Sequence, residues 1–183
     1  MKSILLKDYR LLTDEEHKDL LQIRNADEIR EVSLDAKIIS FDEHLSWIKK
    51  LQDDRQKEYF AVIYNNKIIG GVNTFDIDAK VKWGVFFESL APLMIKSIIP
   101  IYFMDFIFST FTCSDIYAEI KKENLNAISY NKSLGFKLLP RKDIVTMHLT
   151  HENYLKAKNG VILKRVIKKM TLYKFKIERY DER

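Results

Sequence analysis

Residues 115–136 constrain the fold of this chain more than any other stretch, because they predict a strand followed closely by a helix. Residues 116–120 alternate apolar and polar side chains and are rich in β-forming types. Asn124 is a favourable N-cap for a helix over 125–134, and Gly135 stands where a left-handed C-terminal residue is favoured. A strand and a helix joined by so short a turn are typical of an α/β domain.

The same stretch carries two polar side chains suited to chemistry. The strand presents Glu119 near its end, and the helix carries Asn131. One interpretation is the edge of an active site, where a carboxylate meets a polar turn. The other is an ordinary strand–helix unit, and the pattern alone favours this second interpretation.

Two capping boxes mark helix starts in the first part of the chain. Thr13 is followed by Glu16, and Ser40 by Glu43, which is the spacing at which side chain and backbone satisfy each other. The expected elements before residue 90, in order, are a strand over 2–12, a helix after Thr13 that reaches 24–25, a short helix over 27–34, a helix after Ser40, and strands over 59–64, 67–77 and 80–87.

Two further signals refine the second part. Asn65-Asn66 is a type I′ hairpin signal between strands. Ala91-Pro92 opens a long apolar helix, which Pro100 should kink or break. The apolar run 98–111 also holds Asp105 and is too short to span a bilayer, so it predicts a buried helix. Closing strands are expected over 137–139 and 144–149.

The chain divides by charge at about residue 150. Residues 156–183 hold ten Lys/Arg and three Asp/Glu, a net charge of +7, and the remainder is near neutral at −2. Such a body argues against a nucleic-acid partner, whose binding surface would be a folded basic face. One domain over 1–150 and a helical basic extension over 151–183 are therefore expected.

The extension predicts a basic amphipathic helix. Apolar residues fall on one helical face with the lysines largely elsewhere; they are Leu163, Val166, Ile167, Met170, Tyr173 and Ile177. Such a helix can lie on an anionic membrane or in a partner's groove. The favoured interpretation is that it folds back onto its own domain.

Cysteine use and the N-terminus indicate a compartment. Cys113 is the one cysteine, so no internal disulfide can form, which fits a reducing environment. Charged residues interrupt the N-terminal sequence before it forms the apolar segment that a signal peptide requires. The sequence therefore does not predict a signal peptide. A cytoplasmic protein, monomeric or homodimeric and without a metal, is expected.

A family resemblance enters at residues 124–136. Asn124, Ala127, Ile128, Gly135 and Phe136 match the closing N-x-x-A…G-F pattern of the GNAT superfamily, the acyl-CoA-dependent N-acetyltransferases. The first half narrows the resemblance to the enzymes that acetylate UDP-linked 4-amino sugars in the pseudaminic acid pathway; the matching positions are Arg24-Asn25, Ile29-Arg30, Ser40, His44, Trp47-Ile48 and Ile69-Gly70-Gly71. The resemblance covers roughly residues 5–150 and does not reach the extension.

The resemblance implies a mixed, mostly antiparallel sheet flanked by helices, and direct attack of an amine on the thioester of acetyl-CoA in a ternary complex. A carboxylate that accepts the amine's proton is useful there, and Glu119 is the candidate base. The alternative for Glu119 is a strand-end ion pair with Lys121 or Lys122.

The resemblance also implies a nucleotide-sugar site. Arg24 or Arg30 would bind diphosphate through a bidentate fork. Trp47 would stack on uracil, with His44 one helical turn away to bond ribose or phosphate. Asn25, Asn73 and Trp83 complete the expected substrate residues. For His44 the alternative is an exposed surface histidine, and for Trp47 and Trp83 it is core packing.

The acetyl-CoA site departs from the family pattern in its loop. The family places glycines between the strand ending near Phe87 and the next helix, whose amides hold pyrophosphate. This chain has no glycine there, and Pro92 removes one donor. The expected cofactor residues are Val85, Phe86, Phe87, Leu93, Met94, Ile95, Lys96 and Asn124.

The second departure concerns the proton donor. The family's tyrosine falls at Asn131, and a neutral amide has no proton to give at pH 7. Tyr130 lies one residue earlier, about 100° around the helix, and should face elsewhere. Asn131 and Tyr130 are nevertheless the candidate catalytic partners of Glu119.

Three functions stay open from the sequence. The first is acetylation of a nucleotide-linked amino sugar for bacterial surface glycans, and the second is acylation of a protein N-terminus or another small amine. The third is a binding module of the same fold that has lost its acetyl-CoA chemistry. A basic groove would favour the acidic nucleotide substrate, and an acidic groove would favour a basic peptide.

Overall fold

The computed structural model describes residues 2–78, 80–139 and 144–180. The strands are β1 Lys2–Asp8, β2 Lys57–Tyr64, β3 Lys67–Phe75, β4 Lys82–Phe87, β5 Asp115–Ile120, β6 Lys137–Leu139, β7 Val145–Thr150 and β8 Tyr173–Glu178. The helices are α1 Asp14–Asn25, α2 Asp27–Arg30, α3 Phe41–Gln52, α4 Leu93–Thr110, α5 Leu125–Ser133, α6 His151–Asn159 and α7 Val161–Met170, with a 3₁₀ turn at Tyr9–Leu11.

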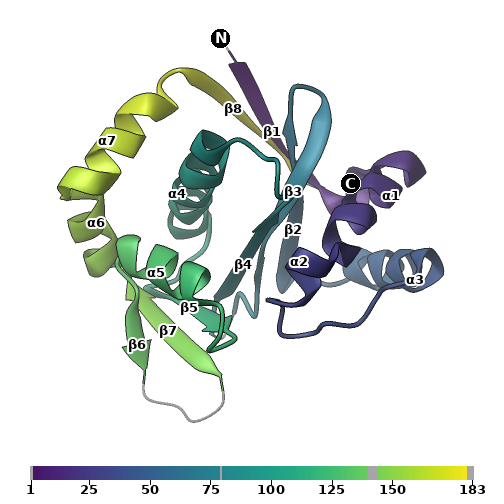
Figure 1. Cartoon of the computed structure of the whole chain (residues 1–183), viewed down its shortest axis with the longest axis horizontal. Coiled ribbons are helices and arrows are strands. Elements are labelled where there is room, and N and C mark those ends of the chain that lie inside the picture. Colours follow the sequence, from purple (N-terminus) through teal and green to yellow (C-terminus); the bar gives the residue numbers. More distant parts are fainter. Residues whose placement is uncertain (1, 79, 140–143, 181–183) are drawn as a thin grey trace.

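All eight strands form one sheet in the order β6-β7-β5-β4-β3-β2-β1-β8. The pairs β1–β8 and β4–β5 are parallel, and the other pairs are antiparallel. Helices α4, α6 and α7 lie to one side of the strands and α1 to α3 to the other (Figure 1). The expected mixed, mostly antiparallel sheet flanked by helices is confirmed.

The sheet splits between β4 and β5. The antiparallel pairs β3–β4 and β5–β7 each hold six residue pairs in register, whereas β4 and β5 are in register only at Lys82 and Tyr117. The amide of Tyr117 donates to the Val81 carbonyl at 2.8 Å, at the end where the strands meet. Beyond this point the strands diverge, which leaves an opening with unpaired strand edges.

Local signals set several boundaries as expected. Thr13 and Ser40 cap α1 and α3, each in a complete capping box. Asn65 and Asn66 have φ of 53° and 61°, as a type I′ turn requires. Gly135 has φ of +99° after α5, a conformation that favours glycine.

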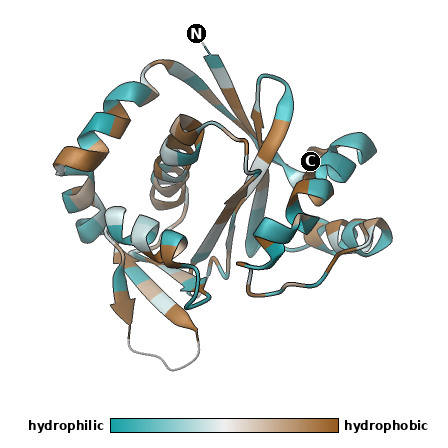
Figure 2. Ribbon diagram, viewed as in Figure 1, coloured by the Kyte–Doolittle hydropathy of each residue, from teal (hydrophilic) through white to brown (hydrophobic). Residues whose placement is uncertain are grey.

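Helix α4 is not broken at Pro100, so the expectation of a break there is wrong, and a kink stays a prediction. The helix continues through Pro100 from Leu93 to Thr110. An interior proline removes one hydrogen bond and crowds the carbonyl four residues earlier. Eight α4 residues, Pro100 among them, are buried, and their packing favours a continuous helix in spite of this cost. Among the described helices α4 alone is long and apolar enough to cross a membrane, and its buried residues account for that composition. Figure 2 shows its hydrophobic turns beside the sheet.

The C-terminal extension is only partly the expected helix. Its basic amphipathic part is α7, whereas the prediction of one helical face reaching Ile177 is wrong, because residues 173–178 form strand β8 beside β1. Tyr173, Phe175 and Ile177 alternate with lysines, a period of two that suits a strand. The buried Tyr154 of α6 donates its hydroxyl hydrogen bond to the Ile101 carbonyl of α4 at 2.9 Å.

Two element ends differ from expectation by four residues each, and several others by one or two. The first strand ends at Asp8, not at residue 12, because the Asp8 carboxylate accepts from the Arg10 amide and starts a 3₁₀ turn. Helix α2 ends at Arg30, not at residue 34. Ser33 then donates its hydroxyl to the Ile29 carbonyl and turns the chain.

Candidate functional site

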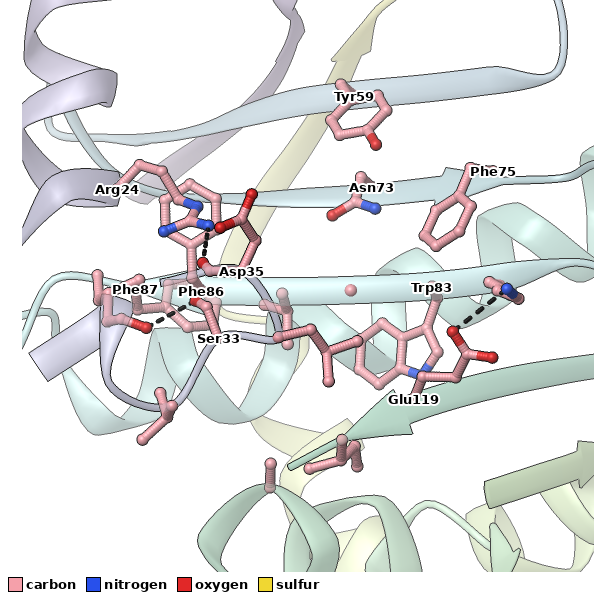
Figure 3. A pocket seen from close by; sticks show the side chains of 18 of the residues that line it. Arg24, Ser33, Asp35, Tyr59, Asn73, Phe75, Trp83, Phe86, Phe87 and Glu119 are labelled. Atoms are coloured by element: carbon pink, nitrogen blue, oxygen red, sulfur yellow. Dashed lines mark hydrogen bonds and ion pairs between the residues drawn. The ribbon is translucent and has the colours of Figure 1, made fainter. Parts of the chain in front are cut away.

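A cavity of about 730 Å³ lies where β4 and β5 diverge. Its walls come from residues 82–87 of β4, residues 118–120 of β5, the start of β2, the end of β3, helix α5, and the segment from the 3₁₀ turn to α3. Figure 3 shows side chains from these elements directed into one space. Segments separated by a hundred residues in the sequence therefore share a single pocket.

Most of the expected site residues line this cavity. They are Arg24, His44, Trp47, Asn73, Trp83, Val85, Phe86, Phe87, Glu119, Asn124 and Asn131. Seven expected residues do not line it: Asn25, Arg30, Leu93, Met94, Ile95, Lys96 and Tyr130. The structure thus separates the candidates that line the cavity from those that do not. The sequence alone could not make this distinction.

Glu119 is paired across the gap between the splayed strands. Its Oε2 accepts from Lys82 Nζ at 3.2 Å, and both side chains are about a quarter exposed. Lys82 Nζ also lies 3.6 Å from Asp76 Oδ2. The alternative pairing with Lys121 is wrong, because Lys121 donates to the Glu31 carbonyl. Glu119 therefore faces the cavity as a carboxylate with one cationic neighbour.

Lys122, the other alternative, contacts Glu123 at 3.8 Å. The pairing of Glu119 with Lys82 was not anticipated. It brings a cation into the cavity close to the candidate base.

Asn131 is held in place at both ends of its amide. Its Oδ1 accepts from Trp83 Nε1 at 3.2 Å, and its Nδ2 donates to the Ala127 carbonyl at 2.8 Å. The side chain is 5% exposed. These bonds hold the Trp83 indole in the cavity wall beside Asn131, which lines the same cavity.

Tyr130 faces away from the cavity, as its rotation on α5 predicts. Its hydroxyl donates to the Ser97 carbonyl of α4 at 3.2 Å. Burial raises the pKa of its phenol above the ordinary value. Neither Tyr130 nor Asn131 is placed to give a proton to a group inside the cavity.

Arg24 is the one of the two candidate arginines that lines the cavity. Its Nη2 donates to the Asp35 carbonyl at 2.9 Å, as Figure 3 shows. Its Nη1 is buried without a hydrogen-bond partner among the described residues. A buried guanidinium nitrogen with no acceptor is costly, so this atom favours an acceptor supplied by a ligand.

Arg30 and Asn25 hold the loop before α3. Arg30 donates to the carbonyls of Asn25 and Ala36, each at 3.0 Å, and also pairs with Asp27. The side-chain amide of Asn25 donates to the Ile39 carbonyl and accepts from the Ile39 N–H. In this structure the two side chains shape the loop that borders the cavity.

Aromatic side chains form one wall of the cavity. Trp47 and Tyr59 meet edge to face with ring centroids 4.8 Å apart, and Tyr9 lies 5.6 Å from Tyr59. Burial, together with Asp54 and Asp76, raises the pKa of Tyr59 to about 12. Sequence reasoning missed Tyr9 and Tyr59, and also Phe75 and Lys82 on neighbouring strands.

His44 is buried, contrary to the surface alternative. Its Nε2 lies 3.0 Å from Nδ1 of His17, and the rings are 7% and 4% exposed respectively. Burial, followed by the charge of His17, lowers the pKa of His44 to about 4, and burial also lowers that of His17. His44 therefore meets the cavity as a neutral ring near pH 7.

The start of α4 offers backbone groups and little else. Pro92 stands at the N-cap position and makes no side-chain cap. Leu93 is 80% exposed and Ile95 lies in the core. Lys96 donates its ammonium to the Ser89 carbonyl at 2.8 Å. The amides of the first turn remain available to an anion by the ordinary chemistry of a helix N-terminus.

The side chains that line the cavity include more carboxylates than cations. The cations are Arg24 and Lys82, and the carboxylates are Glu28, Asp35, Glu43 and Glu119. Glu43 pairs with Lys37, and its hydrogen bonds to Lys37 and Ser40 lower its pKa to about 2. The cavity is not the basic groove that an acidic substrate alone would favour.

Comparison with known proteins gives relatives and structural neighbours. The chain is 35% identical over 77 residues to acetyltransferase PseH of Campylobacter jejuni strain 81-176, which covers 42% of this chain and 48% of the relative. PseH of strain NCTC 11168 matches with the same identity and coverage. The chain thus spans about half the length of the curated relatives it matches.

Solved structures extend the comparison over more of the fold. The crystal structure of C. jejuni N-acetyltransferase PseH aligns with TM-score 0.67 and 24% identity, over 81% of this chain and 98% of that chain. Spermidine N-acetyltransferase from Vibrio cholerae, in complex with CoA and spermine, aligns with TM-score 0.73 and 18% identity, over 83% and 98%. At these identities the likeness establishes the fold.

The family model described as an acetyltransferase (GNAT) domain matches residues 10–145. The match contains the splayed strands, the candidate base and all the residues that line the cavity except Tyr9. The chain therefore belongs to the GNAT acetyltransferase family.

Proposed function

We propose that this protein is an N-acetyltransferase that uses acetyl-CoA to acetylate the amine of a UDP-linked 4-amino sugar, in the synthesis of a bacterial surface glycan. The observation that carries the proposal is the joining of Glu119, Arg24 and the aromatic wall in one cavity at the β4–β5 split. Family membership supports the acetyl-CoA chemistry. The similarity to PseH of C. jejuni supports the amino-sugar substrate.

In the proposed reaction the unprotonated amine attacks the thioester carbonyl directly. The amine needs to lose a proton, and Glu119 accepts it, either directly or through a water. Carbon–nitrogen bond formation and release of CoA thiolate complete the transfer. Because Asn131 and Tyr130 are engaged with protein groups, the thiolate takes its proton from water.

Acetyl-CoA would lie along the open edges of β4 and β5. Residues 85–87 offer backbone groups there, since β4 and β5 are not in register beyond Lys82. The pyrophosphate would meet the first-turn amides of α4, where the helix dipole favours an anion. Asn124, whose Oδ1 caps Ala127, lines the same cavity and would flank the pantetheine arm.

The nucleotide would lie at the wall formed by α1 and α3. The buried, unpartnered Nη1 of Arg24 suits a phosphate oxygen. The rings of Trp47 and Tyr59 offer apolar surface to a base. His44, neutral near pH 7, would exchange a neutral hydrogen bond with ribose.

The acidic lining favours a second candidate, a cationic small amine such as a polyamine. Four carboxylates against two cations attract positive charge. The V. cholerae structural neighbour is a spermidine N-acetyltransferase solved with spermine. In this case Glu119 would meet a second ammonium on the same substrate.

Calorimetry with acetyl-CoA, a UDP-linked 4-amino sugar and spermidine tests the proposal. Binding of acetyl-CoA and the nucleotide sugar, followed by acetylation of the sugar amine, is expected. Binding of spermidine without the nucleotide sugar would establish the second candidate. A protein that binds the nucleotide sugar but not acetyl-CoA would be a binding module, and one that binds none of the three would not be this enzyme. Acetyl-CoA supply places the expected activity in the cytoplasm.

A further inference from the structure

Helix α7 carries four cations for which the described residues provide no ion pair. Lys164, Arg165, Lys168 and Lys169 are all exposed, and none makes an ion pair within the described residues. Residues 153–177 contain eight Lys/Arg and no Asp/Glu. Four other cations of the extension are paired: Lys156 with Glu152, Lys158 with Asp105, Lys176 with Glu178 and Arg179 with Glu58. The charge on α7 is therefore left for something outside the chain.

The fold fixes which side of α7 faces outward. Leu163 is buried in the core, and Val166, Ile167 and Met170 pack against it. These positions share one face of the helix, so the four cations take the opposite face. Figure 1 shows α7 on the outer rim of the molecule, away from α1 and α3. None of the described residues of α7 lines the cavity.

Large apolar side chains stand at both ends of the basic row. Val161 and Ile162 open α7 and are 68% and 69% exposed, and Leu172, just beyond its end, is 64% exposed. Exposed aliphatic groups beside cations are the combination that binds a membrane interface, with cations at anionic headgroups and apolar groups below them.

We propose that the outward face of α7 docks the protein on an anionic lipid bilayer. The cations of α7 complement the charge of anionic headgroups, which favours a bilayer as the partner. The shape of this surface supports the same choice. A partner's groove would take the apolar face of a helix, and that face of α7 is already packed on the core. A bilayer, in contrast, adapts to a convex cationic face. Nucleic acid would not need Val161, Ile162 and Leu172 exposed. The proposal is independent of the acetyl transfer chemistry.

Sedimentation of the full chain with vesicles tests this docking. Phosphatidylcholine vesicles with about 30% phosphatidylglycerol should bind the protein and plain phosphatidylcholine vesicles should not, with binding lost at high salt. The double variant K164E/K168E should weaken binding at least about tenfold, since each cation near the surface contributes to attraction.

The matched control is K49E/K50E, which changes net charge equally at two exposed lysines of α3. It should retain binding. V161S/I162S should weaken binding at unchanged charge. Thermal melts of each variant verify folding. Equal loss in the control, equal binding to uncharged vesicles, or tighter retention on duplex DNA than on anionic vesicles at the same salt would each overturn the proposal.

Discussion

The ammonium of Lys82 lies 3.2 Å from the carboxylate of Glu119, the candidate base. The two groups come from strands that meet at one register pair and then diverge. Asp76 is a second anion, 3.6 Å from Lys82. Under the proposed function, Lys82 and a cationic amine would compete for the Glu119 carboxylate.

The variant Lys82→Met should lower KM for the amine about two- to fivefold, because a partly exposed ion pair of this kind contributes up to about 1 kcal/mol. Steady-state kinetics at saturating acetyl-CoA measure this change. Lys80→Met is the control, since Lys80 lies over the Tyr117 ring at 3.9 Å and does not line the cavity. A raised KM in Lys82→Met would show instead that Lys82 binds the substrate, as it would bind phosphate.

The variant Glu119→Gln should lower kcat by about 10²- to 10⁴-fold, the usual contribution of a positioned base. Affinity for the nucleotide portion should hardly change, because Arg24 and Trp47 lie on α1 and α3 and are untouched. Stopped assays and calorimetry with UDP separate the two effects. An unchanged kcat would remove Glu119 from its assigned role.

The His17–His44 pair should make stability fall on acidification. Burial lowers the pKa of His44 to about 4 in the folded chain, below the ordinary value of about 6.5. The unfolded chain therefore takes up the proton first, and stability present above pH 6.5 is lost between about 6.5 and 4, by up to about 3 kcal/mol. Urea unfolding across this range measures it. His44→Gln should reduce the slope, and an equal slope would contradict the assignment.

Gly71, which packs against two cavity-lining rings, and Gly84, which lines the cavity, should respond differently to substitution by alanine. A Cβ at Gly71 would lie 2.4 Å from Tyr9 Oη and 2.8 Å from the Phe86 ring, so Gly71→Ala should destabilise the fold by about 1–3 kcal/mol. At Gly84 the Cβ would meet only the end of Asn73, at 2.9 Å. Gly84→Ala should leave the melting temperature nearly unchanged and raise KM for the amine. Matching losses of stability would refute this contrast.

A buried ionic network joins the extension to the body of the protein. Arg10 forms a bidentate pair with Asp8, which is fully buried, and reaches Glu58 at 3.3 Å. Arg179 pairs with the other Glu58 oxygen. Arg10→Met should cost about 3–5 kcal/mol, because it leaves a buried carboxylate without its cation.

Arg179→Met is the comparison for that network. Arg179 is 39% exposed and Glu58 would keep Arg10, so the loss should be about 1 kcal/mol or less. Chemical denaturation of both variants gives the two values. A larger cost at Arg179 would mean that attachment of β8 dominates the network.

The elements that the sequence predicts well depend on short-range chemistry. The capping boxes of Thr13 and Ser40 and the Asn65-Asn66 turn need only residues within a few positions, and each forms as expected. Strand β8 was missed because its choice over helix depends on the free edge of β1, far away in the sequence. Helical spacing alone cannot reveal that edge.

The sequence predicted a site residue well where its role does not depend on a partner far away in the chain. It could not predict a role that depends on such a partner. Arg24 and Arg30 look alike in sequence, and only the fold shows that loop carbonyls occupy Arg30. Tyr59 lies opposite Asn73, but a register shift at Val62 and Ile63 displaces the simple hairpin pairing by one residue. Counting from the turn would have placed Val72 there.

The parallel pairing of β8 with β1 has a consequence for the chain while it is being made. Lys2 of β1 pairs with Tyr173 of β8, so at 5–20 residues per second the ribosome needs roughly 10–30 s between these two strands. During that interval β1 has no neighbour on one side, and an open strand edge invites association with other chains. Lysines at Lys2 and Lys7 give that edge charge at both ends, a protection suited to a nascent chain waiting for its last sheet partner.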